Sequence, residues 1–200
     1  MLLLGGCLAV AACSPKPDAP RPPDAGGLKP ESAHGPASPA APIPDAGLTF
    51  TAPPGWVAEP PASANRKAQY RLARVPGDAE DGEVVVYHFP GGGGTPKENV
   101  DRWIGQFTGP DGQLAADAAK ITPSSVDGVP LTMVDVRGAY SGPMASMRQG
   151  ENPKKQFRML AAIAEAGNGP WFVKFTGPEK TVAHWEPSYQ SFVNSIRQDP

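Results

Sequence analysis

The chain is 200 residues long, contains 26 prolines and 23 glycines, and carries a formal net charge of −2 at pH 7. A net charge this close to zero does not indicate a positively charged surface that would bind a phosphate backbone, so we expect no nucleic-acid partner. Both cysteines, Cys7 and Cys13, lie within the first 13 residues, which excludes disulfides and thiol catalysis from the remainder of the chain.

The N-terminus is an apolar segment, too short to span a bilayer, that ends in small residues before Cys13. We interpret residues 1–12 as a signal peptide. The stretch Val10-Ala11-Ala12-Cys13 resembles the lipobox of bacterial lipoproteins, in which the cysteine carries diacylglycerol and becomes the mature N-terminus. Cys7 matches the same pattern, but the chain turns polar and proline-rich after Cys13, which favours Cys13 as the lipidated residue. No Lys or Arg precedes the apolar run, which indicates a translation start further upstream.

The lipoprotein resemblance implies a protein attached to a membrane through its lipid. Two or three acyl chains anchor a protein firmly in a bilayer, whereas a single chain binds only reversibly. In that family an Asp after the cysteine retains the protein in the inner membrane. Ser14 stands there, so the resemblance implies the outer membrane, facing the periplasm. Residues 13–46 contain no aromatic residue and are predicted to form a disordered Pro/Ala-rich tether, with a proline-rich ligand for a partner as the alternative. Residues 47–200 suffice for one globular domain.

The first half of this domain is predicted to form strands at residues 48–51, 56–58 and 69–75. The third strand is expected to end at Pro76-Gly77. Residues 84–89 are an unbroken run of β-branched and aromatic side chains that ends at Pro90, which predicts a strand buried on both faces.

A well-marked helix start follows this strand. Thr95 and Glu98 form a capping box, and Pro96 occupies the first helical position, where a missing N–H costs nothing. An apolar stripe at helical spacing is expected to pack on the sheet, and Gly109-Pro110 is expected to end the helix. The stripe consists of Val100, Trp103, Ile104 and Phe107.

Two hairpins and a final helix complete the domain. Residues 118–126 and 129–140 flank Asp127-Gly128, a dipeptide that favours a type I′ turn. After a polar loop at residues 141–155, strands are predicted at 156–166 and 171–176. A helix then begins at Pro178, and Pro187 is expected to kink or restart it near residue 186. Its apolar face contains Val182, Trp185, Tyr189, Phe192, Val193 and Ile196.

These elements predict an α+β domain, a mostly antiparallel sheet of about six strands flanked by two long helices. Their order is similar to the PsbP-like α/β/α sandwich, and Pro53-Pro54-Gly55-Trp56 after the first strand resembles the start of such domains. The resemblance extends from Leu48 to Arg197. It implies a non-enzymatic binding or assembly factor and provides no catalytic residues.

The candidate surface lies around the glycine run that precedes the first helix. Backbone N–H groups at a helix start bind phosphate, but a P-loop needs Gly directly before its Lys, and here Pro96 precedes Lys97. A flexible connector is therefore the expected role of this run. A polar stripe lies beside the apolar one. This polar stripe and the glycine loop define a candidate ligand or partner surface, with a solvated helix face as the alternative. The surface comprises Gly92, Gly93, Asn99, Arg102 and Gln106.

No other motif indicates chemistry. His88 is expected to be an interior histidine and His184 an exposed one, with no second metal ligand at a suitable spacing. Asp135 and Arg137 share a strand face and are expected to pair. With no nucleophile motif, we expect no catalytic residues, no metal and no cofactor.

We therefore expect a membrane-anchored lipoprotein that acts as a non-catalytic binding or assembly module in the cell envelope and has a protein partner there. The alternatives are an envelope structural or stress-related factor that acts through protein contacts, and a small-molecule or metal-binding periplasmic module. A polar pocket would favour the small-molecule module, whereas a flat exposed apolar patch would favour protein contact.

Overall fold

The structure, a computed structural model, describes residues 47–116, 119–142 and 153–198. The predicted signal peptide, Cys7, Cys13 and the tether lie outside the described residues, as does most of the predicted loop at 141–155. No helix within the described ranges is both long enough and apolar enough to cross a membrane.

Ten strands and two helices make up the described part of the chain. In chain order they are β1 (Leu48–Thr49), β2 (Val57–Glu59), β3 (Arg66–Leu72), β4 (Gly82–His88), α1 (Pro96–Ile104), β5 (Phe107–Thr108), β6 (Lys120–Val126), β7 (Val129–Tyr140), β8 (Lys154–Ala166), β9 (Gly169–Pro178), α2 (Glu179–Asn194) and β10 (Arg197–Gln198).

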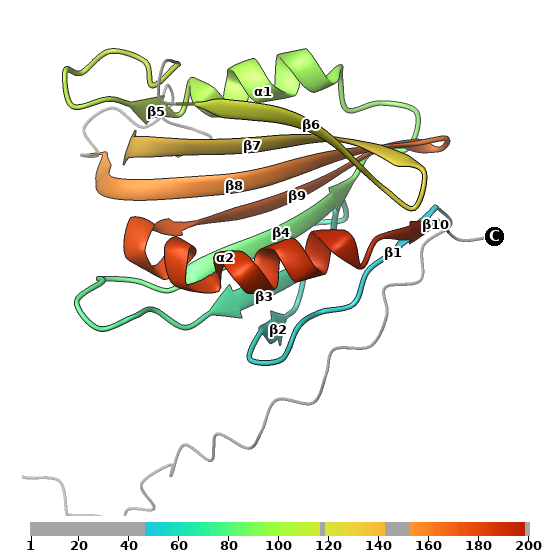
Figure 1. The fold of residues 1–200 in the computed structure, drawn as a ribbon, viewed down its shortest axis with the longest axis horizontal. Coiled ribbons are helices and arrows are strands. Elements are labelled where there is room, and N and C mark those ends of the chain that lie inside the picture. The colour runs from blue at the N-terminus through green and yellow to red at the C-terminus, as the bar shows by residue number, and fades with distance from the viewer. Residues whose placement is uncertain (1–46, 117–118, 143–152, 199–200) are drawn as a thin grey trace, which may run out of the picture. The chain divides into compact units, whose positions relative to one another are not determined.

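Eight of the strands form one antiparallel sheet in the order β2-β3-β4-β9-β8-β7-β5, with β6 also paired to β7 (Figure 1). β1 and β10 form a separate two-stranded ribbon, in which Leu48 lies opposite Gln198. The predicted α+β class, with a mostly antiparallel sheet and two helices, is confirmed. The expected number of about six strands is too low. The unpredicted β5 and β10 have two residues each, too few to show any periodicity, and they exist because a distant strand pairs with them.

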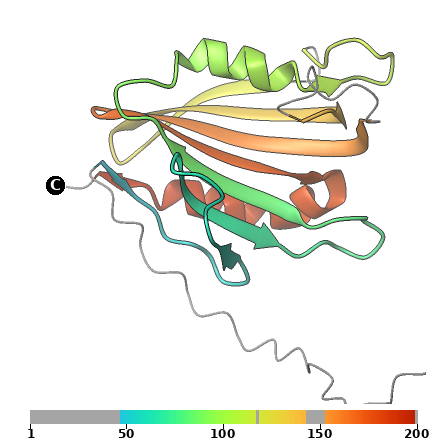
Figure 2. The same ribbon diagram turned by 180° about the vertical axis from the view of Figure 1, so that it is seen from behind.

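The two helices cover opposite faces of the sheet. α2 crosses the near face in Figure 1 and lies behind the sheet in Figure 2. Because successive strand residues point to opposite faces, the sheet supplies two separate apolar clusters. On β9, Trp171, Val173 and Phe175 belong to the cluster under α2, whereas Phe172 belongs to the cluster under α1. The domain is thus a three-layer arrangement of helix, sheet and helix.

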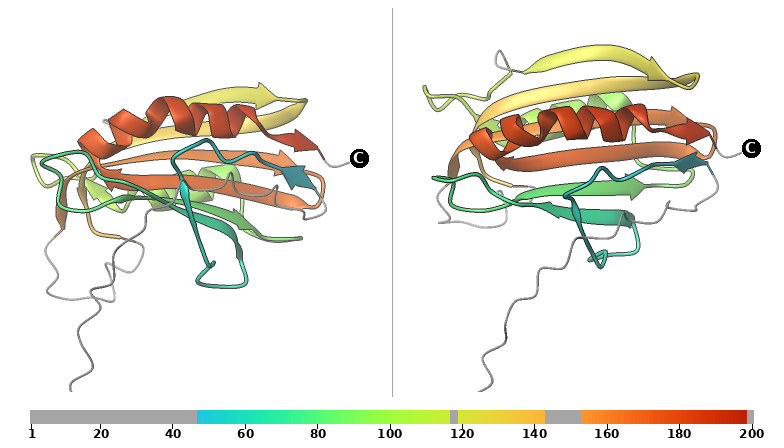
Figure 3. Two further views of the ribbon diagram at one scale, coloured as in Figure 1. Left: turned by 90° about the horizontal axis from the view of Figure 1, so that it is seen from below. Right: turned by 60° about the horizontal axis from the view of Figure 1, so that its bottom comes forward.

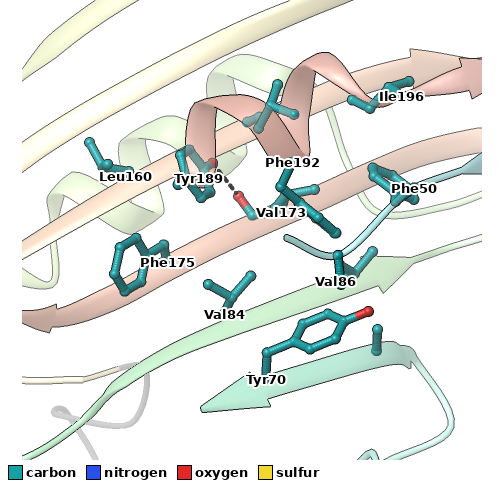
Figure 4. Packing of buried hydrophobic residues seen from close by; sticks show 14 of the residues in the cluster. Phe50, Tyr70, Val84, Val86, Leu160, Val173, Phe175, Tyr189, Phe192 and Ile196 are labelled. Carbon is teal, nitrogen blue, oxygen red and sulfur yellow. Dashed lines mark hydrogen bonds between the residues drawn. The ribbon is translucent and has the colours of Figure 1, made fainter. Parts of the chain in front are cut away.

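The cluster under α2 is built around Tyr189 and Phe192, which have no exposed surface. The Tyr189 hydroxyl donates a hydrogen bond to the carbonyl oxygen of Val173 at 3.1 Å, so its polar atom is satisfied inside the core (Figure 4). α2 runs without interruption through Pro187, so the expected restart near residue 186 is wrong. The side chains packed on both sides of this point hold the helix together. Figure 3 shows α2 lying along the sheet, with β10 continuing beyond its C-terminal end beside β1.

The start of α2 is held by the loop that follows β3. The backbone N–H and the hydroxyl of Thr181 both donate to Oδ2 of Asp78, at 2.9 and 2.6 Å, and the Val75 N–H donates to the Thr181 hydroxyl at 3.2 Å. These contacts draw the chain away from the sheet after Leu72. The prediction of a third strand over residues 69–75 was therefore shifted, since β3 spans Arg66–Leu72.

α1 begins as predicted, with the capping box between Thr95 and Glu98 and a proline at the first position. It ends at Gly105, four residues before the predicted stop. The chain then turns so that Phe107, fully buried, pairs with Tyr140 of β7 as part of β5. The apolar stripe packs on the sheet as expected, with Ile104 only partly buried. Its last residue, Phe107, belongs to β5 and not to α1.

A buried arginine joins α2 to the sheet. Arg158 on β8 is 3% exposed. Its Nε and Nη2 donate to the two carboxylate oxygens of Asp135 on β7, both at 2.8 Å. Its Nη1 and Nη2 donate to Glu186 of α2 at 2.7 and 3.0 Å. The predicted Asp135–Arg137 ion pair is confirmed at 3.6 Å, but it lies at the exposed margin of this arrangement.

The two histidines of the domain lie where the sequence places them. His88 is 2% exposed, and its ring stacks on the indole of Trp171 with the ring centroids 4.2 Å apart. His184 is exposed on α2. No cluster of three or more His, Cys, Asp or Glu side chains able to hold a metal ion occurs among the described residues.

Candidate functional site

A cavity of about 280 Å³ lies between α1 and the neighbouring strands β4 and β9. We call it the α1 pocket. Residues of β4 and β9 contribute its floor, because their alternate side chains point towards α1, and one face of the helix contributes its wall. It is lined by Tyr87, Phe89, Arg102, Trp103, Gln106, Phe172 and Lys174.

The helix side of the pocket is organised by Asn99, which is fully buried. Its Nδ2 donates to the carbonyl oxygens of Gly93 at 2.7 Å and Thr95 at 2.9 Å, and so ties the glycine loop to the first turn of α1. The Arg102 guanidinium in turn donates to Oδ1 of Asn99. A continuous set of hydrogen bonds therefore runs from the loop through Asn99 and fixes the position of Arg102 at the pocket.

The glycine loop packs closely against the sheet. Gly93 has a φ of +94°, and a Cβ at this position would lie 3.0 Å from Pro170 and 3.1 Å from Phe89. Any other residue would therefore be strained by its backbone conformation and crowded as well. Gly93 therefore approaches the aromatic side of the pocket closely, within contact distance of Phe89 and Phe172.

Lys174 lies on the strand side, partly buried, in the middle of β9. It forms no hydrogen bond or ion pair with the described residues, and its Nζ lies over the Trp103 ring, 5.3 Å from the centroid. Loss of hydration on burial lowers the pKa of the Lys174 amine to about 8, and the nearby positive charge of Arg102 adds to this. A lysine without a carboxylate partner in such a place destabilises the domain unless an anion binds to it.

Gln106 adds an unsatisfied polar group. The residue is 8% exposed, and its Oε1 is buried without a hydrogen-bond donor among the described residues. An acceptor left in this state costs about 1–3 kcal/mol. Among the described residues, the pocket thus combines the exposed guanidinium of Arg102, the partly buried amine of Lys174 and an amide oxygen without a donor, a set of polar groups that an anionic ligand could contact.

The remaining walls are aromatic. Trp103 meets Phe172 edge to face, with centroids 5.7 Å apart and planes at 87°. Phe89 packs on Phe172 at 5.6 Å, and the rings of Tyr87 and Phe89 are nearly parallel at 6.2 Å. Polar groups at one place and flat apolar surfaces beside them are typical of small-molecule sites.

The structure distributes the predicted surface residues over three roles. Arg102 and Gln106 line the α1 pocket, and Asn99 and Gly93 hold its parts in position. Gly92 does not line the pocket; it is exposed, and its N–H donates to the Phe89 carbonyl in the turn after β4. Asn99 cannot belong to a solvated face or contact a ligand, because it is fully buried.

Sequence reasoning missed the strand side of the pocket. Phe172 and Lys174 come from β9, which is far from α1 in the sequence, and Tyr87 and Phe89 lie at the end of β4 and directly after it. One signal was present: Lys174 is a lone charged residue inside the apolar run Trp171-Phe172-Val173-Lys174-Phe175. A charge in a strand buried on both faces needs a partner or a ligand.

A second cavity, of about 270 Å³, adjoins the α1 pocket and shares Tyr87 and Lys174 with it. It contains three carboxylates, and each is paired with another cation. Glu83 pairs with Arg66, Glu80 with Lys154, and Asp81 with Arg71. None of these carboxylates forms an ion pair with Lys174 within the part of the chain that the structure describes.

The largest cavity, of about 560 Å³, is a weaker candidate. Its charged lining residues, Arg137 and Glu179, already pair with each other at 3.1 Å. Two of its other lining residues, Ala139 and Gln156, lie in the sequence on either side of the segment 143–152, which is outside the described residues. The α1 pocket is therefore the better site, because Arg102 and Lys174 form no ion pair with a carboxylate in the part of the chain that the structure describes.

No model of a protein family matches the sequence, and no curated protein matches it. Several solved structures are similar in fold. CyanoP, the PsbP of the cyanobacterium Synechocystis, is 16% identical over 86% of this chain and 99% of its own, with a TM-score of 0.48. LpqN of Mycobacterium tuberculosis, involved in cell envelope biogenesis, is 10% identical over 84% and 88%, with a TM-score of 0.47.

A protein of unknown function from Pseudomonas aeruginosa is 12% identical over 66% of this chain and 82% of its own, with a TM-score of 0.45. Similarities of this size carry no inference about what the protein binds. The function has to be argued from the chain's own residues.

Proposed function

We propose that this protein is a lipid-anchored, non-catalytic binding module of the bacterial cell envelope with a PsbP-like domain, and that the α1 pocket binds a small anionic molecule. Cys13 is the proposed lipid attachment site, and the domain would face the periplasm from the outer membrane. The observation that carries the ligand proposal is the pair formed by Arg102 and Lys174, which share one pocket and form no ion pair with a carboxylate among the described residues.

An anion would satisfy both cations at once. Arg102 donates to the neutral amide of Asn99, and Lys174 lies over the face of Trp103. Neither forms an ion pair among the described residues, and the carboxylates of Glu98 and Glu83 interact with them only at longer range. The charges of Arg102 and Lys174 repel each other, as the effect of Arg102 on the pKa of Lys174 shows. Hydrogen bonds between ionised groups are shorter and about twice as strong as neutral ones. A bound anion therefore converts an unfavourable arrangement into a favourable one.

The surface supports a small molecule better than protein contact. The large exposed apolar side chains of the described residues are Leu114 and Ile121, 63% and 52% exposed. Leu114 follows β5 and Ile121 lies on β6, next to the β-breaking Pro123. Two isolated side chains are normal for a protein surface and do not constitute a docking patch.

The test is the thermal unfolding of the full chain with sodium salts of acetate, benzoate and phosphate, at constant ionic strength and pH 7. An anion at a hundred times its dissociation constant adds about 2.7 kcal/mol, which raises the midpoint by about 5–10 °C. The rise should be absent in Lys174→Met and retained in Lys97→Met, an exposed lysine of α1. A rise of equal size in all three proteins, or none with any salt, refutes the ligand proposal and favours a protein partner.

A further inference from the structure

The walls of the α1 pocket specify more than a negative charge. We propose that its ligand is a small aromatic carboxylate, whose carboxylate lies between Arg102 and Lys174 and whose ring packs beside Tyr87 and Phe89, the partly exposed rings of the lining. This inference rests on the proposed function and narrows it to one class of ligand.

The size of the pocket limits the ligand. Sites for drug-sized molecules have volumes of about 300–1,000 Å³, so a cavity of about 280 Å³ accepts a molecule near or below the lower limit. The adjoining cavity past Lys174 is lined by paired carboxylates and by Tyr87 and Thr176. A long acyl chain would have to pass through this polar region, so a compact body is favoured.

The shape of the walls favours a flat body. Phe172 is held edge to face by Trp103 and tilted by Phe89, so its ring is fixed from two sides. Aromatic rings prefer offset or edge-to-face neighbours, and such pairs contribute beyond the area that they bury. An aromatic ligand can form ring–ring contacts with Tyr87 and Phe89 in addition to burying apolar area. A saturated ligand would only bury apolar area.

The charges favour a carboxylate. The guanidinium of Arg102 is planar and is oriented by Asn99, which suits the two oxygens of a carboxylate. Lys174 of β9 lines the same cavity, so its amine can contact the carboxylate together with Arg102.

Isothermal titration calorimetry of the full chain at pH 7 with sodium benzoate, sodium acetate, sodium phosphate and benzamide tests the proposal. Benzoate should bind saturably and at least about tenfold more tightly than acetate or phosphate, because only benzoate satisfies both the charges and the walls. Benzamide has the same shape without the charge and should give no binding. Lys174→Met and Arg102→Gln should each weaken benzoate about tenfold or more, and Lys97→Met should not.

The outcomes separate this inference from the proposed function. If acetate or phosphate binds at least as tightly as benzoate, and this binding is lost in Lys174→Met, the aromatic carboxylate is refuted. The proposal that the α1 pocket binds an anion is then still supported. Benzamide binding as tightly as benzoate overturns both, since charge is then irrelevant. The absence of heat with every anion also overturns both. Since methionine at position 174 is apolar and of similar length, Lys174→Met should fold, and circular dichroism checks this.

Discussion

The arginine that joins α2 to the sheet should be the most sensitive charged residue of the domain. Replacing Arg158 with methionine keeps the length of the side chain and removes four charge-assisted hydrogen bonds to Asp135 and Glu186. Breaking a fully buried ion pair costs about 3–5 kcal/mol. The carboxylates left behind are 27% and 37% exposed, so water recovers part of this. We expect Arg158→Met to lower the free energy of unfolding by about 2–4 kcal/mol.

Urea unfolding of the full chain at pH 7, followed by tryptophan fluorescence, measures this change. The matched control is Arg137→Met, in the neighbouring strand. Arg137 also contacts Asp135, at 3.6 Å, and Glu179, but its side chain is 50% exposed. Exposed pairs contribute about 0–1 kcal/mol, so this variant should lose less than about 1 kcal/mol. Equal losses in the two variants would refute the argument that burial determines the contribution of the arginine.

The pH dependence of the same variant gives a second check. Burial alone would raise the pKa of Asp135, but the hydrogen bonds and charge of Arg158, with help from Arg137, outweigh it and leave that pKa lowered. A carboxylate with a lowered pKa stabilises the fold above its unfolded value near 4, and this contribution is lost as the pH falls through the folded value. The difference between the wild type and Arg158→Met should therefore narrow below about pH 4. A constant difference from pH 7 to pH 3 would contradict this account.

Two further predictions concern Lys174 and the anchor. Because burial lowers the pKa of Lys174 to about 8, the unfolded chain binds more protons between about pH 8 and 10.5, and stability rises with pH across that window. Lys174→Met should be more stable than the wild type by about 1–3 kcal/mol at pH 7 and by less at pH 10, in urea unfolding at both values. Cys13→Ser should move the chain from the detergent phase to the aqueous phase in a bacterium that lipidates proteins, whereas Cys7→Ser should not. The reverse result would assign the lipid to Cys7.

The parts of the fold that sequence predicts best are those with strong local signals. The predicted strand at residues 129–140 coincides with β7, because alternating side chains and a marked turn define it. The start of α1 is correct to the residue for the same reason, since its capping box is a local interaction. The ends of β3 and α1 were misplaced because Thr181 and Tyr140, both distant in the sequence, determine them.

The candidate site shows the same division. Arg102 and Gln106 were found from their helical spacing, but the spacing does not reveal which polar positions are covered, and Asn99 proved to be buried. Lys174 lies opposite this helix only because β9 pairs with β4 and β8 in the assembled sheet. A stripe on one element can be derived from the sequence, whereas a pocket between elements depends on their packing.

The ribbon formed by β1 and β10 determines the order in which the domain can assemble. The Thr51 N–H donates to the Ser195 hydroxyl, 144 positions later in the chain, and the central strand β9 is also among the last to be synthesised. Closing such long loops is slow, because their entropy is lost before many contacts form. The apolar strands β1 to β4 therefore have no stable core until the C-terminal third of the chain is present. The proposed signal peptide at the N-terminus is therefore synthesised well before the domain that follows it can fold.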